Sequence, residues 1–228
     1  MYTLWGYRKT VMGLTQKLLS HHHHDDGSGG VITHLRGYEL FVGAWFLGQR
    51  ARTWDRLVAL AGPQPGDRVL DVGSGTGYFA RRIAPVVEPG GSVVGIDPSQ
   101  PMLVFAAAHA PANCTFQAAG AEDVPFGDAS FDLVVSSLAF HHFPVDCRAD
   151  AVCEMFRVLR PGGRLFNADF RPPSGPVLNR IVAAVTAHAM AHDKAHEIGE
   201  LIRAGGYTVT GTGRTRLMHY VTALRPQG

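Results

Sequence analysis

The sequence predicts an α/β fold: a doubly wound, mostly parallel seven-stranded sheet with helices on both faces (Rossmann-like), an antiparallel last strand and an N-terminal helical lid. Two observations predict this class. Short apolar runs alternate with helical segments through the middle of the chain, as in parallel strands that are buried on both faces. A glycine-rich loop follows the first of these runs, and an acidic residue ends the second.

The 228 residues are expected to form one domain with an N-terminal appendage. Residues 1–30 include His21 to His24 and an Asp- and Gly-rich stretch, which buries too little apolar surface to become ordered. The four histidines are either a metal-binding tract or a flexible one. Residues 31–228 are predicted to form a single domain, which divides into a helical lid (31–61), a ligand-binding half (66–170) and a pocket wall with the last strands (171–228).

Periodicity places the individual elements. Strands are predicted at residues 68–72, 92–96, 115–118, 131–136 and 164–168, with two more near 208–213 and 217–223. Helices are predicted at residues 78–87, 99–110, 149–159, 176–192 and 197–204. Glycine and proline clusters stop the helices, notably Glu88-Pro89-Gly90-Gly91 and Arg160-Pro161-Gly162-Gly163.

The composition excludes several classes of protein. The formal charge is 21 − 19 = +2 with histidines neutral, which gives no basic stripe and argues against a nucleic-acid partner. Three cysteines without CxxC spacing predict neither a zinc site nor a disulfide framework, and they fit a reducing, cytoplasmic location. No apolar run is long enough to span a membrane, and no secretory signal is evident. We therefore expect a cytoplasmic protein with a small-molecule partner; a homodimer is a further hypothesis.

The glycine loop after the first strand reads Asp71-Val72-Gly73-Ser74-Gly75-Thr76-Gly77. Such a loop lets a ligand approach the backbone closely, because glycine has no Cβ and accepts positive φ. The dinucleotide fingerprint GxGxxG requires Gly or Ala at position 78, where this chain has Tyr78. Asp71 is a poor neighbour for a pyrophosphate and a good one for an ammonium group. The loop therefore favours a cationic ligand over a dinucleotide.

Asp97 ends the second predicted strand, 24 residues after Gly73. A carboxylate at that point can accept hydrogen bonds from both hydroxyls of a ribose. The alternative is a turn or N-cap residue before Pro98. Taken together with the glycine loop, Asp97 is predicted to be a ligand-binding residue.

Five motifs follow one another over residues 69–169: Val69-Leu70-Asp71-Val72-Gly73-Ser74-Gly75-Thr76-Gly77, Gly95-Ile96-Asp97-Pro98-Ser99, Ala121-Glu122-Asp123-Val124-Pro125-Phe126, Phe131-Asp132-Leu133-Val134-Val135-Ser136 and Arg157-Val158-Leu159-Arg160-Pro161-Gly162-Gly163. In this order they resemble the class I S-adenosylmethionine-dependent methyltransferases (methyltransferase type 11). The segment Tyr38 to Leu57 and the motif Ala168-Asp169-Phe170 are similar to the ubiquinone/menaquinone-type C-methyltransferases.

The resemblance implies S-adenosyl-L-methionine as cofactor, with S-adenosyl-L-homocysteine as product. Its cofactor-binding residues would be Asp71, Gly73, Ser74, Gly75, Gly77, Asp97, Pro98, Ser99, Met102, Ala121, Glu122 and Ser136. The chain departs from the family at Gly120, where an Asp commonly accepts a hydrogen bond from the adenine amine. Either Glu122, Asp123 or water takes that role, or adenine is held less tightly.

Candidate catalytic residues follow strands four and five, because ligands of open α/β sheets bind beyond the carboxyl ends of the strands. His141 is the first candidate for a general base, His142 the second, and Asp169 the third. The alternatives are a pocket-lining role for the histidines and a turn role for Asp169. No further ligand completes a metal site with the histidine pair, and no metal is predicted.

The predicted substrate pocket combines His141 with Arg171 and with three aromatic residues of the lid, Tyr38, Phe41 and Trp45. These rings could exclude water and favour a sulfonium cation, or they could simply be core residues. His188, His192 and His196 stand four residues apart, and we favour a solvated or pocket-edge face over a metal site for them.

Two other functions stay open at this stage. A nicotinamide-dependent oxidoreductase uses a similar fold, although Tyr78 argues against its fingerprint. A non-catalytic module that binds S-adenosylmethionine and acts through partners is the other. The sequence leaves the acceptor and the methylated atom undefined, because one fold hosts many reactions.

Overall fold

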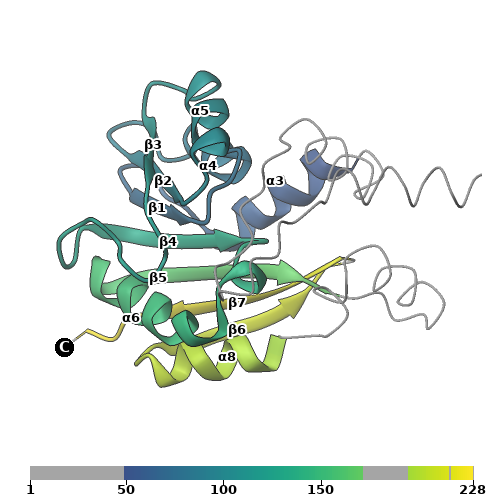
Figure 1. The fold of residues 1–228 in the computed structure, drawn as a ribbon, viewed down its shortest axis with the longest axis vertical. Helices are drawn as coiled ribbons and strands as arrows, with labels where there is room; N and C mark the ends of the chain where they lie inside the picture. Colours follow the sequence, from purple (N-terminus) through teal and green to yellow (C-terminus); the bar gives the residue numbers. More distant parts are fainter. Residues whose placement is uncertain (1–48, 172–194, 216, 228) are drawn as a thin grey trace, which may run out of the picture.

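The computed structural model describes residues 49–171, 195–215 and 217–227, and these contain one seven-stranded sheet (Figure 1). The strands lie in the order β3-β2-β1-β4-β5-β7-β6. Their bounds are β1 Arg68–Val72, β2 Ser92–Asp97, β3 Cys114–Ala118, β4 Phe131–Ser137, β5 Leu159–Phe170, β6 Thr208–Arg214 and β7 Met218–Leu224. Within these ranges β7 alone runs against its neighbours β5 and β6, and the other pairs are parallel. The predicted fold class is confirmed.

Helices cover both faces of the sheet. One group consists of α3 (Arg50–Ala61), α4 (Tyr78–Ile83) and α5 (Gln100–Ala108), of which α4 and α5 lie beside β1, β2 and β3 in Figure 1. The other group, α6 (Arg148–Val158) and α8 (Ala195–Ala204), lies beside β5, β7 and β6. Two apolar clusters fill the layers between helices and sheet. The central strands β1 and β4 are covered on both faces, so their apolar runs are almost continuous, which is why they were predictable. The edge strands β3 and β6 are largely exposed.

Several predicted bounds need correction. The helix predicted at 78–87 ends at Ile83 and passes into turns, and the helix predicted at 99–110 covers only Gln100–Ala108. The fifth strand was predicted at 164–168, but β5 starts at Leu159. Leu159 already pairs with Phe131, and a register shift then accommodates the Pro-Gly-Gly motif inside the strand. A proline or glycine can interrupt a ladder without ending it, because a bulge absorbs the extra residues.

An arginine fixes the long connection between β3 and β4. Arg157 of α6 donates to the carbonyl oxygens of Val124 (2.9 Å) and Phe126 (2.8 Å), and to the carboxylates of Asp128 and Glu154. Glu154 in turn accepts the N–H of Val124 at 2.9 Å. These bonds hold the connection, which carries the predicted cofactor residues Ala121 and Glu122, against α6.

Several predictions lie outside the described residues. They are the flexible segment 1–30 with its histidine tract, the lid residues 31–48 with Tyr38, Phe41 and Trp45, and the helix 176–192 with His188 and His192. Of the predicted lid, the structure describes α3. His196, the second residue of α8, is exposed, in keeping with the solvated alternative. In the described ranges, no helix is both long and apolar enough to cross a membrane.

Candidate active site

Most of the predicted site residues lie at one edge of the sheet, where the parallel strands β1, β2, β4 and β5 have their carboxyl ends. The strand order reverses between β1 and β4, and a ligand crevice is expected at such a switch point. The cofactor candidates come from the last residues of β1, β2 and β4 and from the segments after β1, β2 and β3. Of the catalytic candidates, the two histidines follow β4, and Asp169 is the penultimate residue of β5.

The glycine loop is held to the second strand through its backbone. The N–H groups of Gly73 and Ser74 both donate to the carbonyl of Ile96 at 2.9 Å. Gly73, Gly75 and Gly77 have φ values of 71°, 52° and 70°, a region that favours glycine. A Cβ on Gly73 would also overlap the side chain of Ala139, which follows β4. The loop therefore needs glycine at position 73 for both its conformation and its packing.

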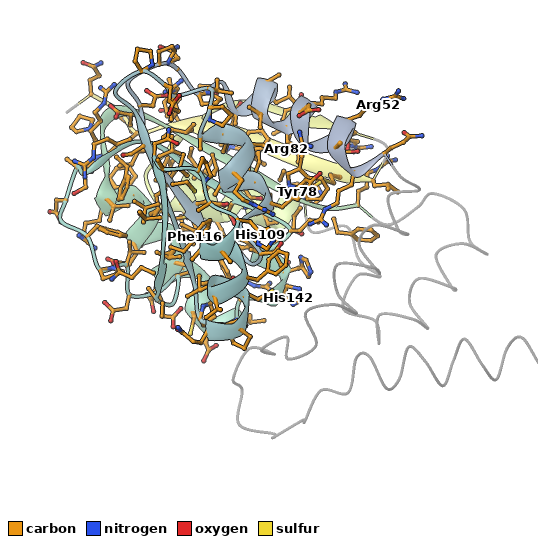
Figure 2. The ribbon with its side chains drawn as sticks, turned by 90° about the horizontal axis from the view of Figure 1, so that it is seen from above. Arg52, Tyr78, Arg82, His109, Phe116 and His142 are labelled. Carbon is orange, nitrogen blue, oxygen red and sulfur yellow. The ribbon has the colours of Figure 1, made fainter. Side chains whose placement is uncertain are left out.

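Tyr78, which broke the dinucleotide fingerprint, packs α3 onto α4. Its ring meets Trp54 edge to face at 5.5 Å, and its hydroxyl accepts a hydrogen bond from Arg82, which also pairs with Asp55. Figure 2 shows Tyr78 and Arg82 close together on α4, with Arg52 of α3 farther along the same side. In the dinucleotide fingerprint the third glycine allows close packing of the helix against the sheet. In this chain Gly77 has that role, because a Cβ at this position would lie 2.8 Å from an edge atom of Phe116.

Asp97 braces the loops on both sides of it. Its Oδ2 accepts the N–H of Gly75 at 2.9 Å, and its Oδ1 accepts the N–H of Ser99 at 2.8 Å. Burial raises the pKa of this carboxyl group, and the two N–H donors partly offset the rise. Asp97 therefore has the turn role that the sequence analysis gave as the alternative to ligand binding. Each oxygen keeps a second acceptor position, so the carboxylate can still receive ribose hydroxyls.

Two buried oxygens beside the loop lack partners among the described residues. They are Oδ2 of Asp71, on a residue that is 1% exposed, and Oγ of Ser74. Burial raises the pKa of Asp71 to about 7. Buried acceptors without partners are rare in folded proteins and usually mark a missing donor. A ligand ammonium group would supply that donor, so these residues fit the amino-acid end of S-adenosylmethionine.

The remaining cofactor candidates lie around the same edge. Ser99 and Met102 are buried at the start of α5, and Pro98 is exposed. Ala121 is buried, whereas Glu122 is exposed and its carboxylate folds over Gly120 into the space where a side chain would stand. Of the alternatives left open for the absent Asp, this geometry favours Glu122. Ser136 is fully buried at the end of β4.

His141 and Asp169 form a buried pair. Nδ1 of His141 lies 2.6 Å from Oδ1 of Asp169, and the backbone N–H of His141 donates to Oδ2 at 2.9 Å. The side chains are 6% and 3% exposed. Burial opposes ionisation of Asp169, but His141, the N–H of Phe170 and His219 together hold the pKa of that carboxyl group below its usual value.

An ionised carboxylate accepts hydrogen bonds only, so Nδ1 of His141 carries the proton. In the neutral imidazole Nε2 presents a lone pair, and this buried atom has no hydrogen-bond partner in the described part of the chain. An oriented imidazole with a free Nε2 is the arrangement required of a general base. The sequence named both residues but did not pair them. The signal was available, since both lie at the carboxyl ends of adjacent parallel strands, His141 just after β4 and Asp169 near the end of β5.

The other catalytic and pocket candidates contribute less. His142 is exposed, and its ring centroid lies 4.0 Å from that of His141. Figure 2 shows His142 on the far side of Tyr78 and Arg82 from Arg52. Arg171 is half-buried, and its backbone N–H donates to the carbonyl of Leu217 at 2.9 Å. In the described ranges, no cluster of three or more His, Cys, Asp or Glu side chains could hold a metal ion.

The sheet order, the glycine loop after β1 and the acid at the end of β2 define a class I S-adenosylmethionine-dependent methyltransferase fold. Comparison with known families agrees. Residues 69–163 match a family model described as a methyltransferase domain. Residues 69–163 are therefore similar to a methyltransferase domain, in agreement with the resemblance of the motifs.

Relatives of known name extend this comparison. The chain is 39% identical over 136 residues to the ubiquinone/menaquinone biosynthesis C-methyltransferase UbiE of Ectopseudomonas mendocina, a match that covers 57% of this chain and 52% of the relative. The corresponding protein of Pseudomonas paraeruginosa is 37% identical over 135 residues, with the same coverage. The chain thus matches about half the length of these curated relatives.

Solved structures share the fold at low sequence identity. A SAM-dependent methyltransferase from Aquifex aeolicus superposes with a TM-score of 0.63 at 20% identity, covering 75% of this chain and 89% of that one. Phosphoethanolamine N-methyltransferase 2 of Haemonchus contortus, solved with S-adenosyl-L-methionine, gives 0.62 at 18% identity, covering 77% and 53%.

Proposed function

We propose that this protein transfers a methyl group from S-adenosylmethionine to a small-molecule acceptor by in-line displacement. The observation that carries the proposal is one sheet edge that combines a cofactor cradle with a general base. The cradle consists of the glycine loop and Asp97. The base is the buried His141–Asp169 pair with its free Nε2.

The cofactor residues have separate roles in this proposal. Asp97 receives the ribose hydroxyls while it braces Gly75. Asp71 and Ser74 accept the ammonium group, and Glu122 faces the adenine amine. Gly73 and Gly77 keep the backbone close to the ligand, with Pro98, Ser99, Met102 and Ala121 around it. When bound, S-adenosylmethionine supplies an activated methyl group on a sulfonium centre.

The chain itself contributes alignment and proton removal. Holding two reactants in line lowers a barrier by up to about 7–11 kcal/mol. A positioned base adds about 10²- to 10⁴-fold when the nucleophile must lose a proton. Nε2 of His141 accepts that proton, and Asp169 stabilises the resulting imidazolium. The pair therefore favours an acceptor with an O–H or an acidic C–H or N–H group over one that is already ionised.

The relatives support a small acceptor, since their names describe C-methylation in ubiquinone and menaquinone biosynthesis. We propose that the acceptor of this chain is also a small molecule and not a nucleic acid, because the positive and negative charges of the chain nearly balance. A cytoplasmic location is proposed on its three free cysteines. A homodimer stays a hypothesis that light scattering would check. The domain limits proposed from the sequence are 1–30 and 31–228, and limited proteolysis would test the boundary between them.

The first experiment is calorimetric titration with S-adenosylmethionine, S-adenosylhomocysteine and NAD. Micromolar binding of both sulfur compounds, absent for NAD, is expected in the wild type and lost in Asp97→Ala. Asp55→Ala, an exposed acid on α3, is the control that keeps binding. Preference for NAD would favour the oxidoreductase alternative. Tight binding without transfer of a labelled methyl group to any of a broad panel of phenols, enols and amines would favour the non-catalytic alternative.

A further inference from the structure

The face of the sheet that α6 and α8 cover changes from apolar to polar along the strands. Val134 of β4, Leu165 of β5 and Ala223 of β7 belong to the apolar cluster on this face. Side chains alternate between faces, so Ser136, Asn167 and Asp169 lie on the same face nearer the carboxyl ends. Ser136 and Asn167 are register partners on neighbouring strands, and Asp169 is the register partner of His219 on β7. The face therefore becomes polar at the carboxyl ends of the strands, where the candidate active site lies.

Ser136 and Asn167 are both deeply buried and lack hydrogen bonds that their burial demands. Ser136 is fully buried and Asn167 is 3% exposed. Oγ of Ser136 and Oδ1 of Asn167 have no hydrogen-bond partner among the residues that the structure describes. An unsatisfied buried polar group destabilises the folded state, and apolar residues would fill these positions without that cost. Stability therefore does not explain their presence.

The two residues stand next to the proposed base. Asn167 and Asp169 are two residues apart on one strand and share a face, which separates their Cα atoms by about 6.5–7 Å. Asp169 holds His141, whose Nε2 is the third buried atom without a partner in this region. Three unpartnered polar atoms thus gather at the ends of β4 and β5, where an acceptor must approach the base.

We propose that Asn167 and Ser136 form a polar subsite for the acceptor, taking a hydrogen-bond-donating group such as a hydroxyl or an N–H. The Asn167 carbonyl oxygen can only accept, which sets the chemistry of the group that it receives. This inference rests on the proposed function, because it takes the ligand to be the acceptor that His141 deprotonates. It adds Asn167, which no sequence motif singled out, as a specificity-determining residue, and it moves Ser136 from the predicted cofactor-binding residues to the acceptor.

The test separates binding from folding with Asn167→Leu, which keeps the shape and removes the polar atoms. If Asn167 is an unsatisfied polar group that serves a ligand, the unliganded Asn167→Leu variant should be more stable than the unliganded wild type. Its Tm should be higher by about 2–4 °C. Phenol is the probe, titrated by nuclear magnetic resonance into protein loaded with S-adenosylhomocysteine. Its Kd is expected to weaken about tenfold in the variant, while binding of S-adenosylhomocysteine is unchanged.

Two controls make the result specific. Anisole, which lacks the hydroxyl donor, should bind the wild type and Asn167→Leu equally. Asn113→Leu changes the same residue type at the opposite edge of the sheet, where Nδ2 donates to the carbonyl of Ala84 at 2.7 Å. That variant should lose stability and keep phenol binding. Ser136→Ala, a smaller change, should weaken phenol binding several-fold if Asn167→Leu does not fold.

Several outcomes would overturn the subsite. They are a lowered Tm in Asn167→Leu, equal phenol binding in the wild type and both site variants, or no phenol binding to wild-type protein that has bound S-adenosylhomocysteine. Failure of the wild type to bind S-adenosylhomocysteine is a different result, because it contradicts the proposed function itself.

Discussion

The two halves of the site are stabilised in different ways. In the cofactor half, Asp97 bonds to backbone N–H groups of its own turn and of the neighbouring glycine loop. In the acceptor half, Asp169 bonds to a side chain, His141, that a separate loop delivers. Every residue type except proline has a backbone N–H donor, so the first arrangement depends mainly on chain conformation. The second depends on two particular side chains, and it leaves polar atoms open for a ligand.

The largest expected effect comes from breaking the acceptor half. Asp169→Asn should lower kcat/KM by about 10²- to 10⁴-fold, because an amide neither fixes the tautomer of His141 nor stabilises its protonated form. The measurement is transfer of labelled methyl to an acceptor from the panel. His142→Ala is the matched control and should retain most activity. Loss of S-adenosylhomocysteine binding in Asp169→Asn would show that the two halves are not separable.

Breaking the cofactor half should act through the backbone. Gly73→Ala combines a positive φ with overlap on Ala139, so the free energy of unfolding should fall by about 2–4 kcal/mol and cofactor binding should be lost. Chemical denaturation and calorimetry measure both effects. Gly75→Ala has a positive φ but open space around its Cβ, so its loss should be smaller. Equal losses in the two variants would exclude packing as the difference.

Asp71 predicts a pH dependence of stability. Its pKa of about 7 lies above its ordinary value of 3.8, so the folded state binds the proton more tightly than the unfolded state does. Its contribution to stability therefore falls as pH rises from about 4 to 7, and its full cost is present above pH 7. Asp71→Asn should be more stable than the wild type at pH 8 by about 1–3 kcal/mol, and should lose the advantage at pH 4.

The smallest effect is expected at the connection that carries Ala121 and Glu122. Arg157→Ala removes the donors that hold this connection to α6, and it should lower the free energy of unfolding by about 1–2 kcal/mol. Faster amide hydrogen exchange in residues 121–128 is the direct readout. Arg160→Ala, which removes an exposed ion pair with Asp132, should change stability by less than about 0.5 kcal/mol. An unchanged exchange rate in Arg157→Ala would contradict the clamp.

Much of this arrangement was predictable from the sequence. The strands, the glycine loop and Asp97 came from apolar runs and local motifs, because short-range patterns dictate short-range structure. The start of β5 was missed, since the Pro-Gly-Gly motif usually ends an element and here lies within a bulged strand. The His141–Asp169 pair was missed as a pair, although both members were candidates, because 28 residues and a helix separate them.

The sequence by itself determined the fold class and the cofactor cradle, since both depend on residue types at short spacing along one strand and its loop. Only the tertiary structure decided how the residues of the proposed acceptor half are arranged. It paired His141 with Asp169, set Asn167 beside Ser136, and used Tyr78 to pack two helices. The physical reason is the parallel sheet, whose long crossovers bring residues from distant parts of the chain to one edge.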